Sequence, residues 1–109
     1  MKSISDKAEV SVDFPDKTYM GSFGRESSFD VKVEPDEVLL RMVRAGAERR
    51  EIAVHLHYYL LADILKEIGQ GLAGHDFLDE SHRAALGDGV AALATSLKAP
   101  ALPKGGKKK

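Results

Sequence analysis

Two histidines one residue apart, His55 and His57, come closer to a metal site than any other residues of this sequence. Imidazole nitrogen is a common ligand of divalent transition metals. On a β-strand, residues i and i+2 point to the same side, so the pair could chelate one ion. On an α-helix they lie about 200° apart and could not. The sequence has no HExxH motif. We therefore expect no metal and no cofactor unless residues 50–57 form a strand.

A second group of charged residues has the chemistry to contact phosphate. Four arginines lie within ten residues of one another, and three lysines end the chain: Arg41, Arg44, Arg49, Arg50, Lys107, Lys108 and Lys109. Such groups attract nucleic acid in a salt-sensitive way. However, Glu48 and Glu51 flank the arginines, and no aromatic residues alternate with them. Nucleic-acid binding is therefore the alternative function rather than the favoured one.

The charge distribution supports this order. The sequence holds 16 basic and 17 acidic residues; five of the basic ones lie in 98–109, and every acidic one lies at or before Asp88. Residues 1–97 therefore carry a formal charge of −6 and residues 98–109 carry +5. A split of this kind is typical of a mildly acidic domain with a solvated basic tail.

No arrangement in the sequence indicates catalysis. None of the serines lies in a GxSxG pattern, and the glycines at 21 and 24 lack the lysine of a phosphate-binding loop. The adjacent acidic residues at 36–37 and 79–80 are explained by helix starts, where they favour the helix dipole. We therefore predict that the chain is not an enzyme.

The elements that position these residues begin with strands. Residues 8–14 and 29–33 alternate apolar and polar side chains. Residues 18–23 are β-rich in composition, with Tyr19 and Phe23 on one face, and turn residues separate the three segments. This pattern predicts an antiparallel three-stranded meander with one apolar face. Pro35, followed by acidic residues, then indicates the start of a helix that ends near Gly46. Continuation of the sheet through Val38 and Met42 is the weaker alternative.

Residues 49–73 contain two periods. Ile52, Val54 and Leu56 alternate with polar residues as in a strand, whereas the apolar residues from Leu61 to Leu72 follow helical spacing. No turn residue separates the two halves, and the composition favours helix. We therefore predict a helix throughout, in which His57 packs in the core or at a subunit contact.

A final helix is predicted over residues 77–97, with Asp76 or Asp79 as its cap and an apolar stripe from Leu78 to Leu97. A break at 87–89, which contains two glycines, is the alternative. The run 98–109 contains Pro, Gly and Lys with nothing to bury, and we expect it to be disordered.

Length and composition set the frame for these elements. The chain has 109 residues, which is enough for one modest core, and it has no cysteine, which fits a reducing compartment. No apolar run is long enough to cross a membrane. We predict one cytoplasmic α+β domain over 1–97, in which an N-terminal three-stranded antiparallel meander packs against two or three C-terminal helices.

The thin core predicted here favours pairing with another surface. We expect a non-catalytic protein-interaction or assembly module that binds a second copy of itself, as a homodimer, or another protein. The residues expected at the interface share apolar helical positions, together with one histidine: His57, Leu61, Ile64, Ile68, Leu86, Val90 and Leu93.

Overall fold

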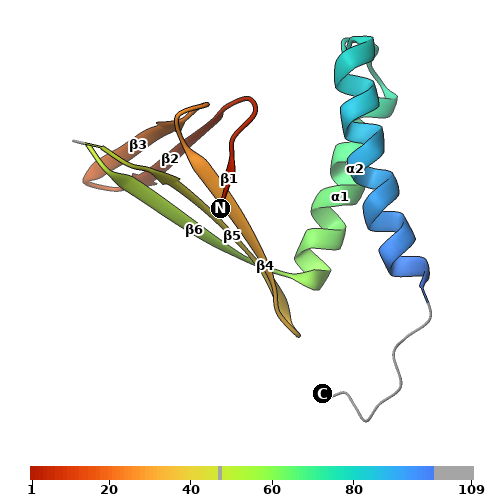
Figure 1. The fold of residues 1–109 in the computed structure, drawn as a ribbon, viewed down its shortest axis with the longest axis horizontal. Helices are drawn as coiled ribbons and strands as arrows, with labels where there is room; N and C mark the ends of the chain where they lie inside the picture. Colours follow the sequence, from red (N-terminus) through yellow and green to blue (C-terminus); the bar gives the residue numbers. More distant parts are fainter. Residues whose placement is uncertain (47, 100–109) are drawn as a thin grey trace. The chain divides into compact units, whose positions relative to one another are not determined.

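The computed structural model describes residues 1–46 and 48–99 and has an α+β fold, as predicted (Figure 1). Within these residues it contains six strands and two helices: β1 (Lys2–Ser3), β2 (Ala8–Phe14), β3 (Lys17–Phe23), β4 (Ser28–Val33), β5 (Glu37–Arg44), β6 (Arg50–His57), α1 (Tyr58–Ala73) and α2 (Glu80–Lys98). The chain divides into two compact units, Met1–Ala62 and Asp63–Lys109, with the boundary inside α1. Each unit is described by itself.

The first unit contains two antiparallel sheets, so the predicted three-stranded meander is wrong. One sheet has the strand order β1-β4-β5-β6, and the other is the β2-β3 hairpin. Pro15 and Asp16 form the hairpin turn, because Phe14 pairs with Lys17. After β3 the chain turns at Gly24, whose carbonyl accepts a hydrogen bond from the Ser27 amide at 2.9 Å. This turn separates β3 from β4, so the two strands enter different sheets.

The predicted helix after Pro35 is also wrong, because this segment is β5. Pro35 and Asp36 form the two-residue turn of a β4-β5 hairpin, in which the Glu34 amide donates to the Glu37 carbonyl at 2.8 Å. Proline fits a turn as well as it fits the first turn of a helix. Leu39 of this strand is half-buried on the more polar face of the sheet.

Residues 50–57 form strand β6, which contradicts the predicted helix. β6 pairs with β5 along its whole length, from Arg50 opposite Arg44 to His57 opposite Glu37. The connection before it contains Gly46, whose φ of +117° is accessible to glycine at little cost. Pairing with β5 satisfies the backbone of β6, and this tertiary interaction outweighs helix propensity. α1 begins at the residue that follows β6.

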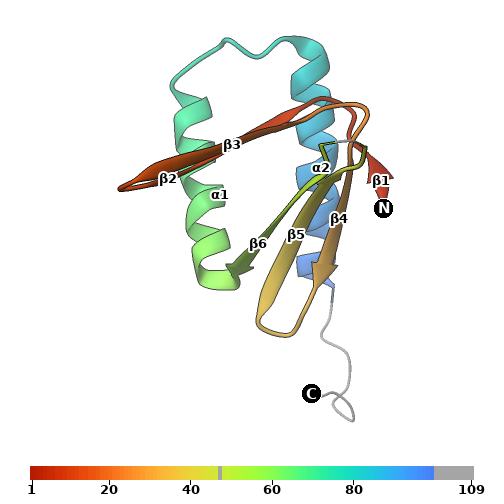
Figure 2. The same cartoon turned by 90° about the vertical axis from the view of Figure 1, so that its left-hand side faces the viewer.

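The small core of the first unit lies where the β2-β3 hairpin crosses one end of the other sheet (Figures 1 and 2). Phe23 of β3 is 3% exposed and is the one buried hydrophobic residue among those described. The hairpin leaves the other end of the apolar face uncovered, where Val31 and Val33 are 49% and 73% exposed.

In the second unit, α1 and α2 run in opposite directions and are joined by residues 74–79 (Figure 2). The predicted final helix is confirmed as α2 and continues through Gly87 and Gly89 without a break. Neither helix contains a buried residue. Of the predicted tail, Lys98 ends α2 and residues 100–109 lie outside the described part of the chain. Neither of the two helices is long and apolar enough to cross a membrane.

The start of α2 gives a pH-dependent prediction. Asp79 Oδ1 accepts a hydrogen bond from the His82 amide at 2.8 Å, and this bond holds the pKa of Asp79 below its ordinary value of 3.8. Because the folded pKa is lower than the unfolded one, the cap contributes its full stability above pH 3.8 and loses it as pH falls through the lowered folded value.

Circular dichroism of wild type and Asp79→Asn measures this contribution, because asparagine also caps a helix but does not titrate. Wild type should lose relative helicity against Asp79→Asn only below pH 3.8, whereas identical acid profiles would contradict the assignment.

Candidate functional site

His55 and His57 project from the same face of β6, and the carboxylate of Glu37 on β5 reaches both. Glu37 lies directly opposite His57, and Leu39, two residues further along β5, lies opposite His55. The ring Nδ1 of His55 is hydrogen-bonded to Glu37 Oε2 at 2.8 Å. The ring Nε2 of His57 lies 3.3 Å from Glu37 Oε1. One carboxylate therefore lies between two imidazoles.

This cluster lies at the surface of the sheet. The side chains of His55 and His57 are 57% and 64% exposed, whereas that of Glu37 is 21% exposed. The Tyr58 hydroxyl donates a hydrogen bond to the Glu34 carbonyl at 2.7 Å, which connects the first residue of α1 to the β4-β5 turn. The arrangement orients both rings and leaves them accessible to solutes.

The sequence pointed to the two histidines only on condition that 50–57 is a strand, and that condition is met. It missed Glu37, which was assigned to a helix start. The strand alternation of 50–57 was a visible signal, but the pairing of Glu37 with His57 depends on the β5-β6 register. Within residues 1–46 and 48–99, no group of three or more His, Cys, Asp or Glu is placed so that it could hold a metal ion.

The four arginines do not form one patch. Arg41 and Arg44 are three residues apart on β5 and therefore point to opposite faces of the sheet, and Arg50 pairs with Arg44. Arg41 lies 3.6 Å from Asp30 and 3.4 Å from Glu51.

The other arginines of the group also have acidic partners. Glu26 lies 3.6 Å from Arg44, Glu51 lies 3.1 Å from Arg49, and Glu48 lies 3.3 Å from Arg50. The lysines at 107–109 lie outside the described residues.

Most residues expected at an interface lie on the helices. Leu61 and Ile64 of α1 are half-buried, and the others are exposed: Ile68 (53%), Leu86 (51%), Val90 (61%) and Leu93 (43%). His57 was wrongly placed on a helix with them. His57 is the last residue of β6 and lies beside Glu37, and α1 begins at the next residue, Tyr58.

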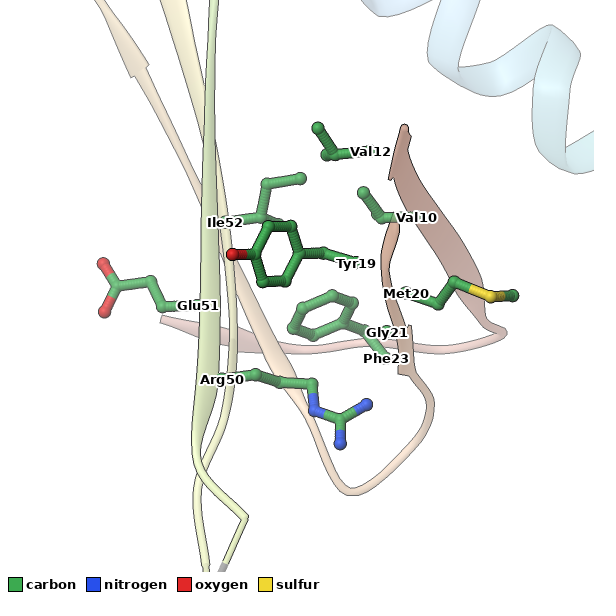
Figure 3. A pocket seen from close by; sticks show the side chains of 9 residues that line it. All are labelled: Val10, Val12, Tyr19, Met20, Gly21, Phe23, Arg50, Glu51 and Ile52. Atoms are coloured by element: carbon green, nitrogen blue, oxygen red, sulfur yellow. The ribbon is translucent and has the colours of Figure 1, made fainter. Parts of the chain in front are cut away.

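A hollow of about 400 Å³ separates the β2-β3 hairpin from the start of β6 (Figure 3). Val10, Tyr19 and Phe23 point from the hairpin toward Ile52, whereas Glu51 points away on the other side of β6. Gly21 allows close approach here, because a Cβ at that position would lie 3.3 Å from Cδ of Arg50. The walls are mainly apolar, and they lack the convergent polar groups of a small-molecule site.

Comparison of the chain with models of protein families, with curated proteins and with solved structures gave no match.

Proposed function

We propose that the chain is a non-catalytic, cytoplasmic assembly module that forms a homodimer through the apolar faces of α1 and α2. The observation that carries this proposal is that neither helix contains a buried residue, although both have large apolar side chains in helical register. Most of the stability of a helix in a protein comes from packing its apolar face rather than from helix propensity.

The composition of α2 makes packing especially necessary. Gly87 and Gly89 lie inside the helix, and each costs about 1 kcal/mol relative to alanine. A Cβ at either position would meet nothing within 4 Å. These glycines give a second helix room to approach closely. A helix that carries this cost is expected to have a partner that offsets it.

The two helices of one chain do not supply that partner to each other. They make few contacts with one another, and Leu65 of α1 and Leu93 of α2 are both more than 40% exposed. Two antiparallel helices from each of two copies can form a four-helix bundle, in which the apolar stripes of all four face inward. A second copy always presents matching helix lengths and stripes, and two-fold pairing is the commonest form of self-association.

Nucleic-acid binding has less support as the alternative. The arginines at 41, 44, 49 and 50 each have a carboxylate within 4 Å, and Arg41 and Arg44 lie on opposite faces of the sheet. A phosphate backbone would have to displace these partners, so the basic groups do not present one continuous surface to a strand.

The test is the molar mass in solution, measured by light scattering over a range of protein concentrations. We expect twice the chain mass of 11.8 kDa, with a monomer appearing on dilution and helicity falling as it appears. A monomer that keeps full helicity at every concentration would overturn the proposal. A dimer unaffected by changes on the helices would reject this interface only.

A further inference from the structure

β6 is the terminal strand of its sheet, so its outer side has no strand partner among residues 1–46 and 48–99. We propose that, in the homodimer, β6 pairs with β6 of the second copy as two antiparallel strands, with Val54 on the two-fold axis. This inference rests on the proposed self-association, because a two-stranded contact alone is marginally stable in water and the helices must hold the copies together. α1 follows β6 without a linker, so paired helices bring the two strand edges to a high effective concentration.

The sequence of β6 is complementary to itself in this register. Antiparallel strands of one continuous sheet place residues from the same face opposite each other. With Val54 opposite its own copy, Ile52 lies opposite Leu56 of the second copy on the apolar face. On the polar face Glu51 lies opposite His57, so a carboxylate meets an imidazole that can donate a hydrogen bond to it. Every large apolar residue of the strand then has an apolar partner across the contact.

The neighbouring registers are less complementary. With Ala53 on the axis, Arg50 lies opposite Leu56 on the apolar face. With His55 on the axis, two imidazoles face each other and Ile52 lies beyond the end of the opposing strand. The side chains therefore favour the register with Val54 on the axis. This self-complementarity is the reason for naming a second copy, rather than a different protein, as the partner of the edge.

The β2-β3 hairpin gives an independent reason for a strand beside β6. It crosses the apolar face near the start of β6 and continues past that strand (Figure 2). Phe23, at the base of the hairpin, is 3% exposed. Nearer the turn the apolar side chains are open to solvent, at 41% for Val12, 49% for Phe14 and 54% for Tyr19. A strand added to β6 would lie under this overhanging part of the hairpin and bury it.

The two-fold arrangement covers a second exposed region as well. Because the paired strands are antiparallel, the start of β6 lies beside the end of β6 in the second copy. The overhanging part of the hairpin is therefore directed toward Leu56 of the second copy and toward Val38, which pairs with it. Val38 pairs in turn with Val33, which is 73% exposed at the end of the apolar face that its own hairpin leaves uncovered. Each copy thus covers the open part of the other's sheet.

The experiment is disulfide cross-linking of single-cysteine variants, which the absence of native cysteine makes specific. Val54→Cys places two thiols directly opposite each other, with Cα atoms about 4.5–5.5 Å apart, within the range of a disulfide. Ala53→Cys is the matched control, because its two copies are diagonal neighbours about 7–8 Å apart. Under mild oxidation Val54→Cys should form the covalent dimer at least about tenfold faster than Ala53→Cys. Random collision predicts the reverse order, since Ala53 is exposed and Val54 is half-buried.

Amide hydrogen exchange of the wild-type chain, measured by NMR, gives a readout that needs no substitution. In an edge strand only every second amide is directed to the neighbouring strand and protected, whereas pairing on both sides should protect the amides throughout 51–57. Circular dichroism checks that both cysteine variants are folded.

Light scattering separates the two possible failures. In a protein with the mass of a dimer, equal or reversed cross-linking rates, or protection of alternate amides only, would overturn the strand pairing and leave the helix contact standing. A monomer at every concentration would overturn the self-association and this contact with it.

Discussion

Replacing Phe23 by alanine should destabilise the first unit by about 3 kcal/mol, the low end of the range for buried Phe→Ala substitutions. Phe23 is 3% exposed and lies where the β2-β3 hairpin meets β6. The low end applies because a hollow of about 400 Å³ already adjoins the ring, so part of its surroundings is open before the change. Against a typical total stability of 5–15 kcal/mol, this loss is large.

Denaturant unfolding followed by tyrosine fluorescence measures the effect, because Tyr19 lies in the same hairpin. Phe14→Ala is the matched control. Phe14 is 49% exposed, and its ring packs edge-on against that of Tyr19 with 6.0 Å between the ring centroids. Its removal should lower the free energy of unfolding by about 1 kcal/mol. If Phe23→Ala does not fold, Phe23→Leu gives a milder test with an expected loss of less than about 1.5 kcal/mol. Equal losses at Phe14 and Phe23 would show that the hairpin does not pack on the sheet as described.

Leu93→Glu should dissociate the proposed dimer. Leu93 lies on the apolar stripe of α2 with Leu86 and Val90. A carboxylate there would have to be buried in the interface without a partner. A cost of about 2 kcal/mol per copy, typical of an interface hot spot, amounts to about 4 kcal/mol per dimer. That cost raises the dissociation constant by about a thousandfold.

Thr95→Glu introduces the same charge two residues away, on the opposite side of α2, and should leave the dimer intact. Light scattering gives the mass, and circular dichroism shows whether α2 stays helical. Dissociation by Leu93→Glu alone is the expected result. A dimeric Leu93→Glu protein would remove this face from the interface, and dissociation by both variants would point to general destabilisation rather than to a specific contact.

The sequence was most informative where local pattern and tertiary structure agree. Strict alternation over 8–14 and helical spacing beyond Leu61 both correspond to elements of the structure, and Asp79 caps α2 as one of the two residues proposed. The α+β class follows from these elements. In each case the residues of the segment itself favour the secondary structure that the protein adopts.

The wrong predictions concern segments whose secondary structure depends on pairing with residues distant in the sequence. Pro35 is compatible with both a helix start and a hairpin turn, and only pairing of β4 with β5 selects the turn. Residues 50–57 alternate as a strand does, but no turn residue precedes Tyr58, so helix propensity favoured one helix across both halves of the segment. The His–Glu–His cluster depends on this pairing, because Glu37 meets the histidines only through the β5-β6 register.

The position of β6 in its sheet has a further consequence. In the strand order of the first unit, β6 is terminal and pairs with β5 on one side only. The strand has eight residues and no proline, and the apolar side chains of Ile52, Val54 and Leu56 occupy every second position along it. Such an edge is a template for amyloid-like stacking of like strands.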